Sequence, residues 1–352
     1  MHELLFAFLR GARIKMISYD SIRAMLPLAV PVSAAVCAVL IVRLLPLLQR
    51  YALARPNARS SHVVPTPQGA GIAVIAATLV IASICSIMSG GTVPATLFGA
   101  TLFIAMVGFV DDVRPISVAP RLLLQTAAVA AVLLAAPADL QLVPSLPLTV
   151  ERGILLVAGV WFVNLVNFMD GLDLMTAAEV VPITGATILL WVFRECPTLP
   201  AIVAAALGGA MLGFAPFNRP VAKVFLGDVG SLPIGLLLGW ILLQLAWTGH
   251  PIAALLLPLY YLADATLTLL RRIARGEPFW MAHRSHYYQR ATNNGFTVLE
   301  VVSHVFVVNI ALAAMALASA GVGSMGLRLL FLLTGALTVA LVLFRFSSVK
   351  LR

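Results

Sequence analysis

Charged residues are scarce in this chain. Asp, Glu, Lys and Arg make up 11% of its 352 residues, against about a quarter in a typical soluble domain. Hydrophobic residues make up 61%, and the mean hydropathy is +1.02. A soluble enzyme is therefore excluded. The apolar runs are unbroken and lack the alternation of barrel strands, so we predict an all-α, polytopic helical membrane protein.

Cysteine and acidic residues are scarce too. Cys37, Cys85 and Cys196 are scattered, without the spacing of a disulfide framework or a zinc site. Basic residues outnumber acidic ones by 23 to 14, which gives a formal net charge of +9. Such a charge can indicate nucleic-acid binding, but basic cytoplasmic loops account for it in a membrane protein. We therefore predict no nucleic-acid partner.

Eleven apolar runs are candidates for membrane-spanning helices. They are residues 25–47, 69–89, 92–110, 121–137, 153–168, 174–193, 199–215, 229–247, 251–272, 299–320 and 326–346. The fourth and fifth are short or interrupted, so ten spans is the alternative. We predict one bundle and a single membrane domain over residues 1–352, with residues 1–24 as an N-terminal tail. In this tail apolar residues precede basic ones, the reverse of a signal peptide, and Met16 and Met25 are alternative starts of translation.

The basic residues separate the two sides of the membrane. Loops that follow odd-numbered runs carry most of them: Arg50, Arg55, Arg59, Arg114, Arg219, Lys223, Arg271, Arg272, Arg275, Arg284, Arg290, Arg345, Lys350 and Arg352. The other loops carry only Arg152, Arg194 and Arg328. The positive-inside rule makes the odd side cytoplasmic, in the plasma (inner) membrane of a cell. The basic tail contradicts this assignment unless translation starts later.

The residues capable of chemistry gather on the same side. His62, Asp111, Asp112, Asn164, Asn167, Asp170, Asp173, Asp228, His283 and His286 all lie in or beside odd-side loops. A cation-coupled transporter, the alternative function, needs polar groups near the middle of the membrane, where Glu179 and Asp264 are the main candidates. The clustering at one face favours an enzyme that works at the cytoplasmic surface.

Asp111 and Asp112 end the third apolar run. The negative end of the helix dipole lies there and disfavours two adjacent carboxylates. A bound divalent cation, Mg²⁺ in particular, would relieve both repulsions, because it prefers oxygen ligands. A solvated helix end is the alternative, and the two residues alone do not decide between them.

Two further stretches carry carboxylates. In N-L-V-N-F-M-D-G-L-D, Asn164 and Asn167 share one helical face just before the turn at Asp170, which favours a functional site over a chance cluster. Asp173 alone could cap the next helix. In K-V-F-L-G-D-V-G-S, glycines bracket Asp228 before the eighth run. Free amides there suit phosphate, but a carboxylate needs a bridging metal, and an N-cap of the next helix is the alternative.

Two basic loops complete the set. His283 and His286 lie three residues apart beside Arg284, with no cysteine to complete a zinc site. Such a loop suits phosphate oxygens better than a zinc ion. The alternative is a basic loop whose only role is to set the orientation of the helices in the membrane. Arg59 and His62 precede the turn-forming prolines and glycines before the second run, which suits a phosphate or sugar contact.

Together these stretches resemble the polyprenyl-phosphate N-acetylhexosamine-1-phosphate transferases, of the glycosyltransferase family 4 type, a superfamily that includes phospho-N-acetylmuramoyl-pentapeptide transferase. The resemblance covers roughly residues 55–295 and rests on R-S-S-H-x-x-P-T-P, D-D, N-x-x-N-F-M-D-G-L-D, F-L-G-D-x-G-S and H-R-S-H-Y-Y-Q in that order. The last motif is similar to the branch that starts O-antigen or other surface glycans. Gln68 and Ala70 depart from the usual Arg and Gly, and no third acidic residue follows Asp112.

The resemblance implies a substrate pair and a cofactor. A UDP-N-acetylamino sugar would donate its sugar 1-phosphate to undecaprenyl phosphate in the lipid bilayer, with Mg²⁺, or alternatively Mn²⁺, and UMP would leave. It further implies that Asp228 binds the metal, with Asp111 and Asp112 close to it and to the lipid phosphate. The implied substrate contacts are Asn167 and Asp170 to the diphosphate, Asp173 and Phe225 to uracil, and His283, Arg284 and His286 to phosphates or sugar.

A general base is not required by this chemistry. The second pKa of a phosphate monoester is about 6, so the lipid phosphate is mostly a dianion at neutral pH. Asp111 or Asp112 stays the candidate base at lower pH. A CDP-alcohol phosphotransferase is disfavoured, because Asp170-Gly171 continues as Leu172-Asp173 rather than as that family's motif. The sugar, the glycan pathway and the choice between monomer and homodimer stay open.

Overall fold

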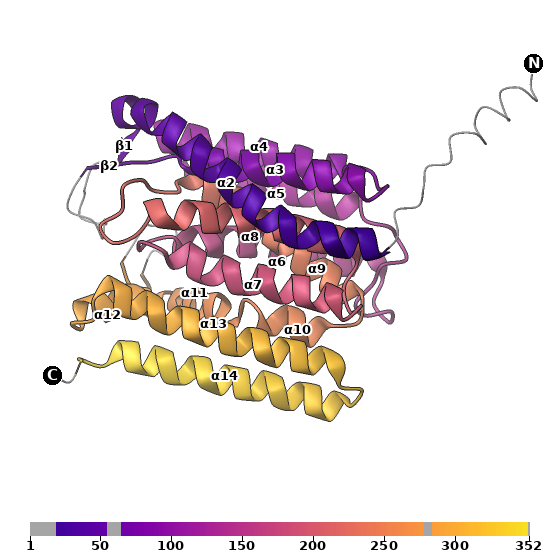
Figure 1. Cartoon of the computed structure of the whole chain (residues 1–352). Helices are drawn as coiled ribbons and strands as arrows, with labels where there is room; N and C mark the ends of the chain where they lie inside the picture. The colour runs from indigo at the N-terminus through magenta and orange to yellow at the C-terminus, as the bar shows by residue number, and fades with distance from the viewer. Residues whose placement is uncertain (1–18, 55–64, 278–283, 351–352) are drawn as a thin grey trace, which may run out of the picture.

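The fold is a bundle of long helices with short loops. The computed structural model describes residues 19–54, 65–277 and 284–350. The long helices of these residues are α2 (Tyr19–Tyr51), α3 (Gly71–Met88), α4 (Ala95–Val113), α5 (Val118–Leu134), α6 (Leu148–Met169), α7 (Met175–Val192), α8 (Thr198–Phe214), α9 (Asp228–Trp247), α11 (Leu259–Ala274), α13 (Val298–Gly321) and α14 (Met325–Ser347). The shorter ones are η1 (Ala215–Phe217), α10 (Pro251–Leu256) and α12 (Tyr287–Asn293). They lie roughly side by side (Figure 1).

The predicted class is confirmed. Within the described residues, nine helices are long and apolar enough to cross a membrane: α2, α3, α4, α6, α7, α8 extended by η1, α9, α13 and α14. A further apolar helix, α5, has 17 residues. Each of the eleven predicted runs overlaps a helix or, for the ninth, a pair of helices. The protein is therefore a polytopic helical membrane protein.

Three details of the prediction are wrong. The ninth run is not one helix: α10 ends at Leu256 and α11 begins at Leu259, with Pro258 between them, whose missing N–H weakens a continuous ladder. The fifth run is not short, because α6 has 22 residues. α2 begins at Tyr19, inside the predicted tail.

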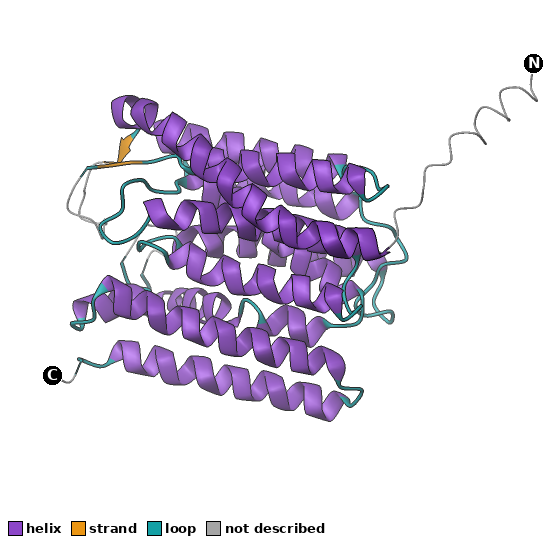
Figure 2. Ribbon diagram, in the orientation of Figure 1, coloured by secondary structure: helices purple, strands orange, loops and turns teal. Residues whose placement is uncertain are grey.

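Two short strands lie at one end of the bundle (Figure 2). β1 (Leu53–Ala54) pairs antiparallel with β2 (Thr66–Pro67). Gln68 forms a parallel bridge with Phe225. These pairings tie the segment between α2 and α3 to the loop that leads into α9. The sequence analysis interpreted this region as a basic loop rich in turn-forming prolines and glycines and did not predict the strands.

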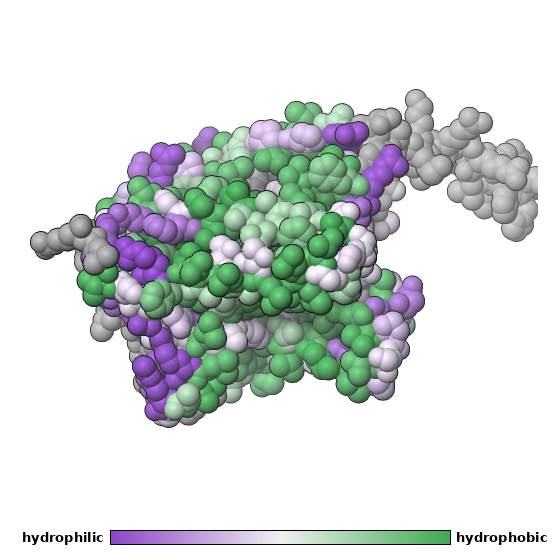
Figure 3. Space-filling view, turned by 90° about the horizontal axis from the view of Figure 1, so that it is seen from below, coloured by the Kyte–Doolittle hydropathy of each residue, from purple (hydrophilic) through white to green (hydrophobic). Residues whose placement is uncertain are grey.

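The helix ends separate into two groups. The strands, α12 and the C-terminal end of α14 all lie at the left end in Figure 1, as loop parity predicts. Seen from below, apolar residues fill the middle of the surface and hydrophilic ones gather toward its two ends (Figure 3). On α14 the outward residues include Leu333, Leu337, Leu341 and Phe344, each more than half exposed. Such a band suits contact with lipid tails.

Helices α3, α4 and α9 meet with almost no side chain between them. A Cβ built on Gly108 of α4 would lie 2.2 Å from the carbonyl oxygen of Asp228, and one on Gly71 of α3 would lie 2.3 Å from Cα of Gly230. Only glycine permits such approach of backbone to backbone. The beginning of α9 is thus held against the end of α4 and the beginning of α3.

Candidate active site

Asp112 binds the beginning of α9. Its Oδ1 accepts the backbone N–H of Asp228 (2.9 Å), and its Oδ2 accepts that of Val229 (3.0 Å). Gln68 Nε2 also donates to Oδ1. A carboxylate from α4 therefore caps α9, which has no cap from its own chain segment. The interaction fixes the position of Asp228 relative to Asp111.

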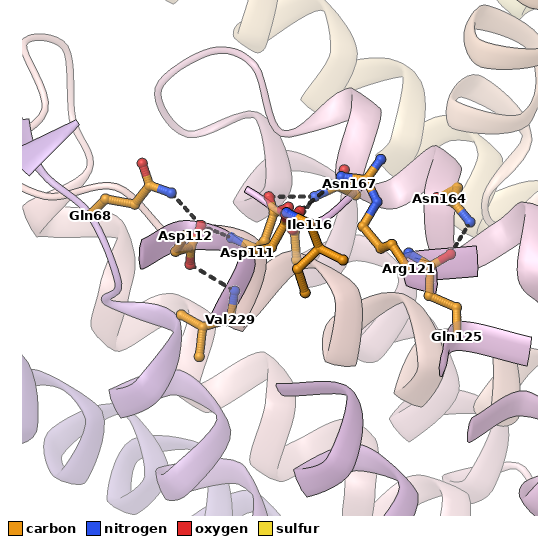
Figure 4. Close-up of polar contacts among 11 residues, drawn as sticks. Gln68, Asp111, Asp112, Ile116, Arg121, Gln125, Asn164, Asn167 and Val229 are labelled. Carbon is orange, nitrogen blue, oxygen red and sulfur yellow. Dashed lines mark hydrogen bonds and ion pairs between the residues drawn. The ribbon is translucent and has the colours of Figure 1, made fainter. Parts of the chain in front are cut away.

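Asp111 points to the other side of α4 (Figure 4). Its Oδ1 accepts the backbone N–H of Ile116 (2.6 Å), and its Oδ2 forms an ion pair with Nη1 of Arg121 on α5 (2.8 Å). The Asp111 side chain is 7% exposed. Its carboxyl group also lies near that of Asp228, close enough for the two groups to interact. Two carboxylates can share such a contact only when a proton or a cation lies between them.

Asn167 on α6 completes this group. Its Nδ2 donates to Oδ1 of Asp228 (2.7 Å) and to Oγ of Ser231 (2.9 Å). Asn164, one turn earlier, instead donates to Oε1 of Gln125 on α5 (2.6 Å). Figure 4 shows the two asparagines pointing to different partners. The structure thus brings Asn167 to the carboxylates and directs Asn164 to the α5–α6 contact.

The loop between α6 and α7 carries two more predicted carboxylates. Asp170 accepts a hydrogen bond from Oγ1 of Thr176. Burial, together with the smaller effect of the negative charges of Asp112 and Asp173, raises the pKa of Asp170 to about 7, although the hydrogen bond from Thr176 opposes the shift. Asp173 accepts the backbone N–H of Ala222 (3.1 Å). It does not cap α7, whose N-cap residue, Leu174, has no side-chain cap.

The loop before α9 joins the strands by its backbone. Phe225 donates its N–H to the carbonyl of Pro67 (2.8 Å), and its carbonyl accepts the N–H groups of Gly69 (3.1 Å) and Ala70 (3.0 Å). Phe225 is partly exposed at this end of the bundle. Gln68 departs from the family pattern, yet it still contacts the site through Asp112.

The basic loop contributes two described residues. Arg284 is partly buried, and its Nε is buried without a hydrogen-bond partner. His286 is 4% exposed, with its ring 6.4 Å from the ring of Phe168 and 5.7 Å from that of Tyr288, measured between centroids. Phe168 directly follows Asn167, so this loop borders the carboxylate group. Three predicted residues, Arg59, His62 and His283, lie outside the described residues.

An apolar cavity of about 350 Å³ opens between α5, α6, α9, α10 and α11. Every residue that lines it is apolar or aromatic, among them Val129, Gly159, Gly239 and Leu255. Val129 lies two turns along α5 from Arg121, on the same side of the helix. The cavity and the polar site therefore share the α5–α6 face, with Gln125 and Asn164 between them.

The donor set suits Mg²⁺. Within the described residues, no group of three or more His, Cys, Asp and Glu side chains is arranged to hold a metal ion. Mg²⁺ does not need one, since it is usually bound by one or two carboxylates together with substrate phosphates. The contact between Asp111 and Asp228 is where a cation would replace a shared proton, and Asn167 keeps an amide oxygen beside it.

The sequence analysis did not select Arg121. It lies in an apolar run and belongs to no motif that was recognised. A signal exists in the spacing, because Arg121 and Gln125 are four residues apart at the start of that run and hence on one helical face. Glu179, a candidate for a transport path, instead accepts Nδ2 of Asn309 on α13 (2.6 Å).

Known proteins are similar in sequence to this chain. The sequence model of glycosyl transferase family 4 matches residues 94–246, which span α4 to α9 and hold the carboxylates. Decaprenyl-phosphate N-acetylglucosaminephosphotransferase of Mycobacterium leprae is 29% identical over 294 residues, 72% of this chain and 73% of the relative. The same enzyme of Mycobacterium tuberculosis is 29% identical, covering 72% of each. Phospho-N-acetylmuramoyl-pentapeptide-transferase of Mycobacterium avium is 33% identical over 148 residues, 36% of this chain and 40% of the relative.

Fold and site thus define an integral membrane transferase. Residues 94–246 match the model of glycosyl transferase family 4, the family whose motifs the sequence resembles. The matched helices are the ones that bring Asp111, Asp112, Asn167 and Asp228 together.

Proposed function

We propose that this enzyme transfers N-acetylglucosamine 1-phosphate, or a closely related N-acetylamino-sugar 1-phosphate, from a UDP-sugar to a polyprenyl phosphate. The observation that carries the proposal is the convergence of Asp111, Asn167 and Asp228, with an apolar cavity that begins about one helical turn away along α6, at Val163. A polar site of this kind can hold phosphates while the cavity takes the adjoining part of a lipid tail. The related decaprenyl-phosphate N-acetylglucosaminephosphotransferases suggest the donor sugar and the class of acceptor.

The reaction needs positioning and charge neutralisation more than acid–base chemistry. An oxygen of the lipid phosphate attacks the β-phosphorus of the donor and forms a new P–O–P linkage. The bond from the β-phosphorus to the bridging oxygen breaks, and UMP leaves with the electron pair. The attacking phosphate is already mostly a dianion at neutral pH, so no proton must be removed first.

Each residue of the site has its own role in this reaction. Mg²⁺, with Mn²⁺ as the alternative, would supply charge neutralisation at the diphosphate, and Asp228 is its best-placed ligand. Asp111 borders the same position and, through its ion pair, keeps the guanidinium of Arg121 beside the lipid phosphate. Asn167 orients Asp228. We assign to Asp112 the task of holding α9, because both its oxygens already accept N–H donors. A role of Asp112 as ligand or base is the alternative.

The remaining predicted residues would contact the UDP-sugar donor. Asp170 would order the diphosphate, Asp173 and Phe225 the uracil, and Arg284 and His286 the phosphates or sugar. Arg59, His62 and His283 stay predictions of the same kind. Asn164 acts from the α5–α6 contact rather than on the phosphates.

We further propose that the site faces the cytoplasm across the plasma membrane. Support comes from the basic residues at the same end, such as Arg114, Arg219, Arg275 and Arg290. The product would be the first lipid-linked sugar of a cell-envelope glycan, with O-antigen as one case and undecaprenyl phosphate as the expected acceptor.

The test is a donor panel. Purified protein in lipid receives UDP-N-acetylglucosamine and its 6-deoxy relatives, with undecaprenyl or decaprenyl phosphate and Mg²⁺, and released UMP is measured. Asp228→Asn should release almost none. Asp139→Asn makes the same chemical change in an exposed turn at the opposite end and should behave as wild type. No UMP from any donor, or full release by Asp228→Asn, would refute the proposal.

A further inference from the structure

Asp264 is a buried carboxylate outside the group that performs the proposed reaction. It lies on α11, and its exposed fraction is 0%. Its Oδ1 accepts the backbone N–H of Tyr287 (2.9 Å), and its Oδ2 accepts that of Tyr288 (3.0 Å). Its Oδ1 also lies 3.3 Å from Nδ1 of His286. Tyr260 on α11 donates its hydroxyl to Oδ2 (3.2 Å).

The three contacts to residues 286–288 give this carboxylate a specific task. Burying a carboxylate is costly unless its oxygens are hydrogen-bonded. Here the hydrogen bonds that offset the cost of burial come chiefly from one short segment of the basic loop. Arg271, two turns later on the same helix, donates Nη2 to the carbonyl of Ser285 (2.6 Å). Helix α11 therefore holds this segment at two points, and the contact from Asp264 reaches the ring of His286.

The segment lies against the reacting groups. Tyr288 donates its hydroxyl to the carbonyl of Phe168 (2.9 Å), the residue after Asn167. A Cβ on Gly171 would lie 2.1 Å from that hydroxyl oxygen, so the loop after Asp170 packs directly on Tyr288. The His286 ring lies between Phe168 and Tyr288. Its orientation is thus coupled to the position of the diphosphate-binding loop.

We propose that Asp264 is a positioning residue that sets the orientation and the tautomer of His286. Both oxygens of Asp264 already accept backbone N–H groups and so act as acceptors, which means that Nδ1 of His286 carries the proton and donates it to Asp264. Nε2 is then the ring nitrogen that meets a phosphate oxygen of the donor. A carboxylate partner that fixes a working histidine in this manner is a common device of active sites. The inference rests on the proposed function, in which His286 contacts the donor.

A kinetic comparison tests the inference. Asp264→Asn keeps the shape but presents an amide N–H toward the N–H groups that the carboxylate accepted. We expect kcat to fall about 10- to 100-fold, with a smaller change in the KM for the lipid. Tyr260→Phe is the matched control, because it removes one hydrogen bond to the same carboxylate and leaves His286 in place; it should stay within about twofold of wild type. Equal losses in both variants would refute a role through His286.

A double-mutant cycle separates positioning from general stabilisation. If Asp264 acts through His286, then Asp264→Asn should cost little in a His286→Ala background, although each single substitution is costly. Additive losses would overturn the inference. Wild-type UMP release tests the proposed function itself. An active wild type with an unaffected Asp264→Asn variant therefore refutes only the role of Asp264.

The third measurement uses wild-type protein, so its result does not depend on whether a variant of Asp264 folds. Nitrogen-15 NMR of histidine-labelled wild-type protein reports the tautomer, and the signals of His286 are those missing from His286→Gln. The inference predicts a protonated Nδ1. A neutral ring with a bare Nδ1 and a protonated Nε2 would contradict it.

Discussion

Replacing Gly108 with alanine is a sharp test of how α4 positions Asp228. The added Cβ would lie 2.2 Å from the carbonyl oxygen of Asp228 and 2.6 Å from the backbone nitrogen of Val229. Ordinary contacts begin at 3.4 Å, so the two helices must separate by about 1 Å. The cap bonds from Asp112, now 2.9 and 3.0 Å, would lengthen to about 4 Å and break.

The magnitude follows from these two effects. Overpacking a buried contact costs about 1–3 kcal/mol in the free energy of unfolding. Each lost hydrogen bond to the Asp112 carboxylate adds about 1.5 kcal/mol or more. A catalytic group displaced by about 1 Å loses about 100-fold in rate. We therefore expect Gly108→Ala to lower both the melting temperature and the rate of UMP release.

Gly99 supplies the matched control on the same helix. A Cβ there has nothing within 4 Å, and alanine favours a helix by about 1 kcal/mol over glycine. Both variants are compared in thermal unfolding, followed by fluorescence-detected gel filtration, and in UMP release at saturating substrates. Gly99→Ala should match or exceed wild type in stability. If Gly108→Ala equals Gly99→Ala in both assays, the backbone contact of α4 and α9 does not position the site.

Three further outcomes are expected. Asn167→Ala removes both donors to Asp228 and Ser231 and should lower kcat about 10- to 100-fold; unchanged kcat would contradict its place in the site. The raised pKa of Asp170, about 7, means that the folded state binds its proton more tightly than the unfolded state, so metal-free stability should fall as pH rises from about 4 to about 7. Asp170→Asn should flatten that slope in thermal unfolding, and an unaltered slope would assign it to other groups. Chelation should abolish UMP release and Mg²⁺ should restore it; activity that persists in excess chelator would exclude the metal.

Much of the architecture follows from composition and pattern. Apolar runs and their spacing predict the helices, since lipid permits little else, and the breaks in the runs give most of their ends. The distribution of basic residues between odd and even loops predicted that Asp111, Asp170 and Asp228 lie at the same face of the membrane. The gap at Pro258 was missed because the hydropathy on both sides of it is continuous.

The individual partners of the site residues were beyond prediction. Asp111 and Asp112 are adjacent in sequence and have the same side chain, yet one pairs with Arg121 and the other caps α9. This difference depends on the 100° rotation between successive helical residues and on which helices pack beside each. Asn164 and Asn167 diverge for the same reason. The role of Asp264 depends on a loop that folds back onto α11, which no local pattern reveals.

The fate of the β-phosphorus tests the central claim most directly. UDP-N-acetylglucosamine labelled with ³²P at the β-phosphate is incubated with polyprenyl phosphate, Mg²⁺ and the protein in lipid. The proposed transfer of sugar 1-phosphate predicts that the label enters the lipid fraction and that the released UMP is unlabelled. Label recovered in UDP would show that the sugar alone is transferred, and label in water-soluble sugar phosphate without lipid would show hydrolysis. Either result would contradict the account.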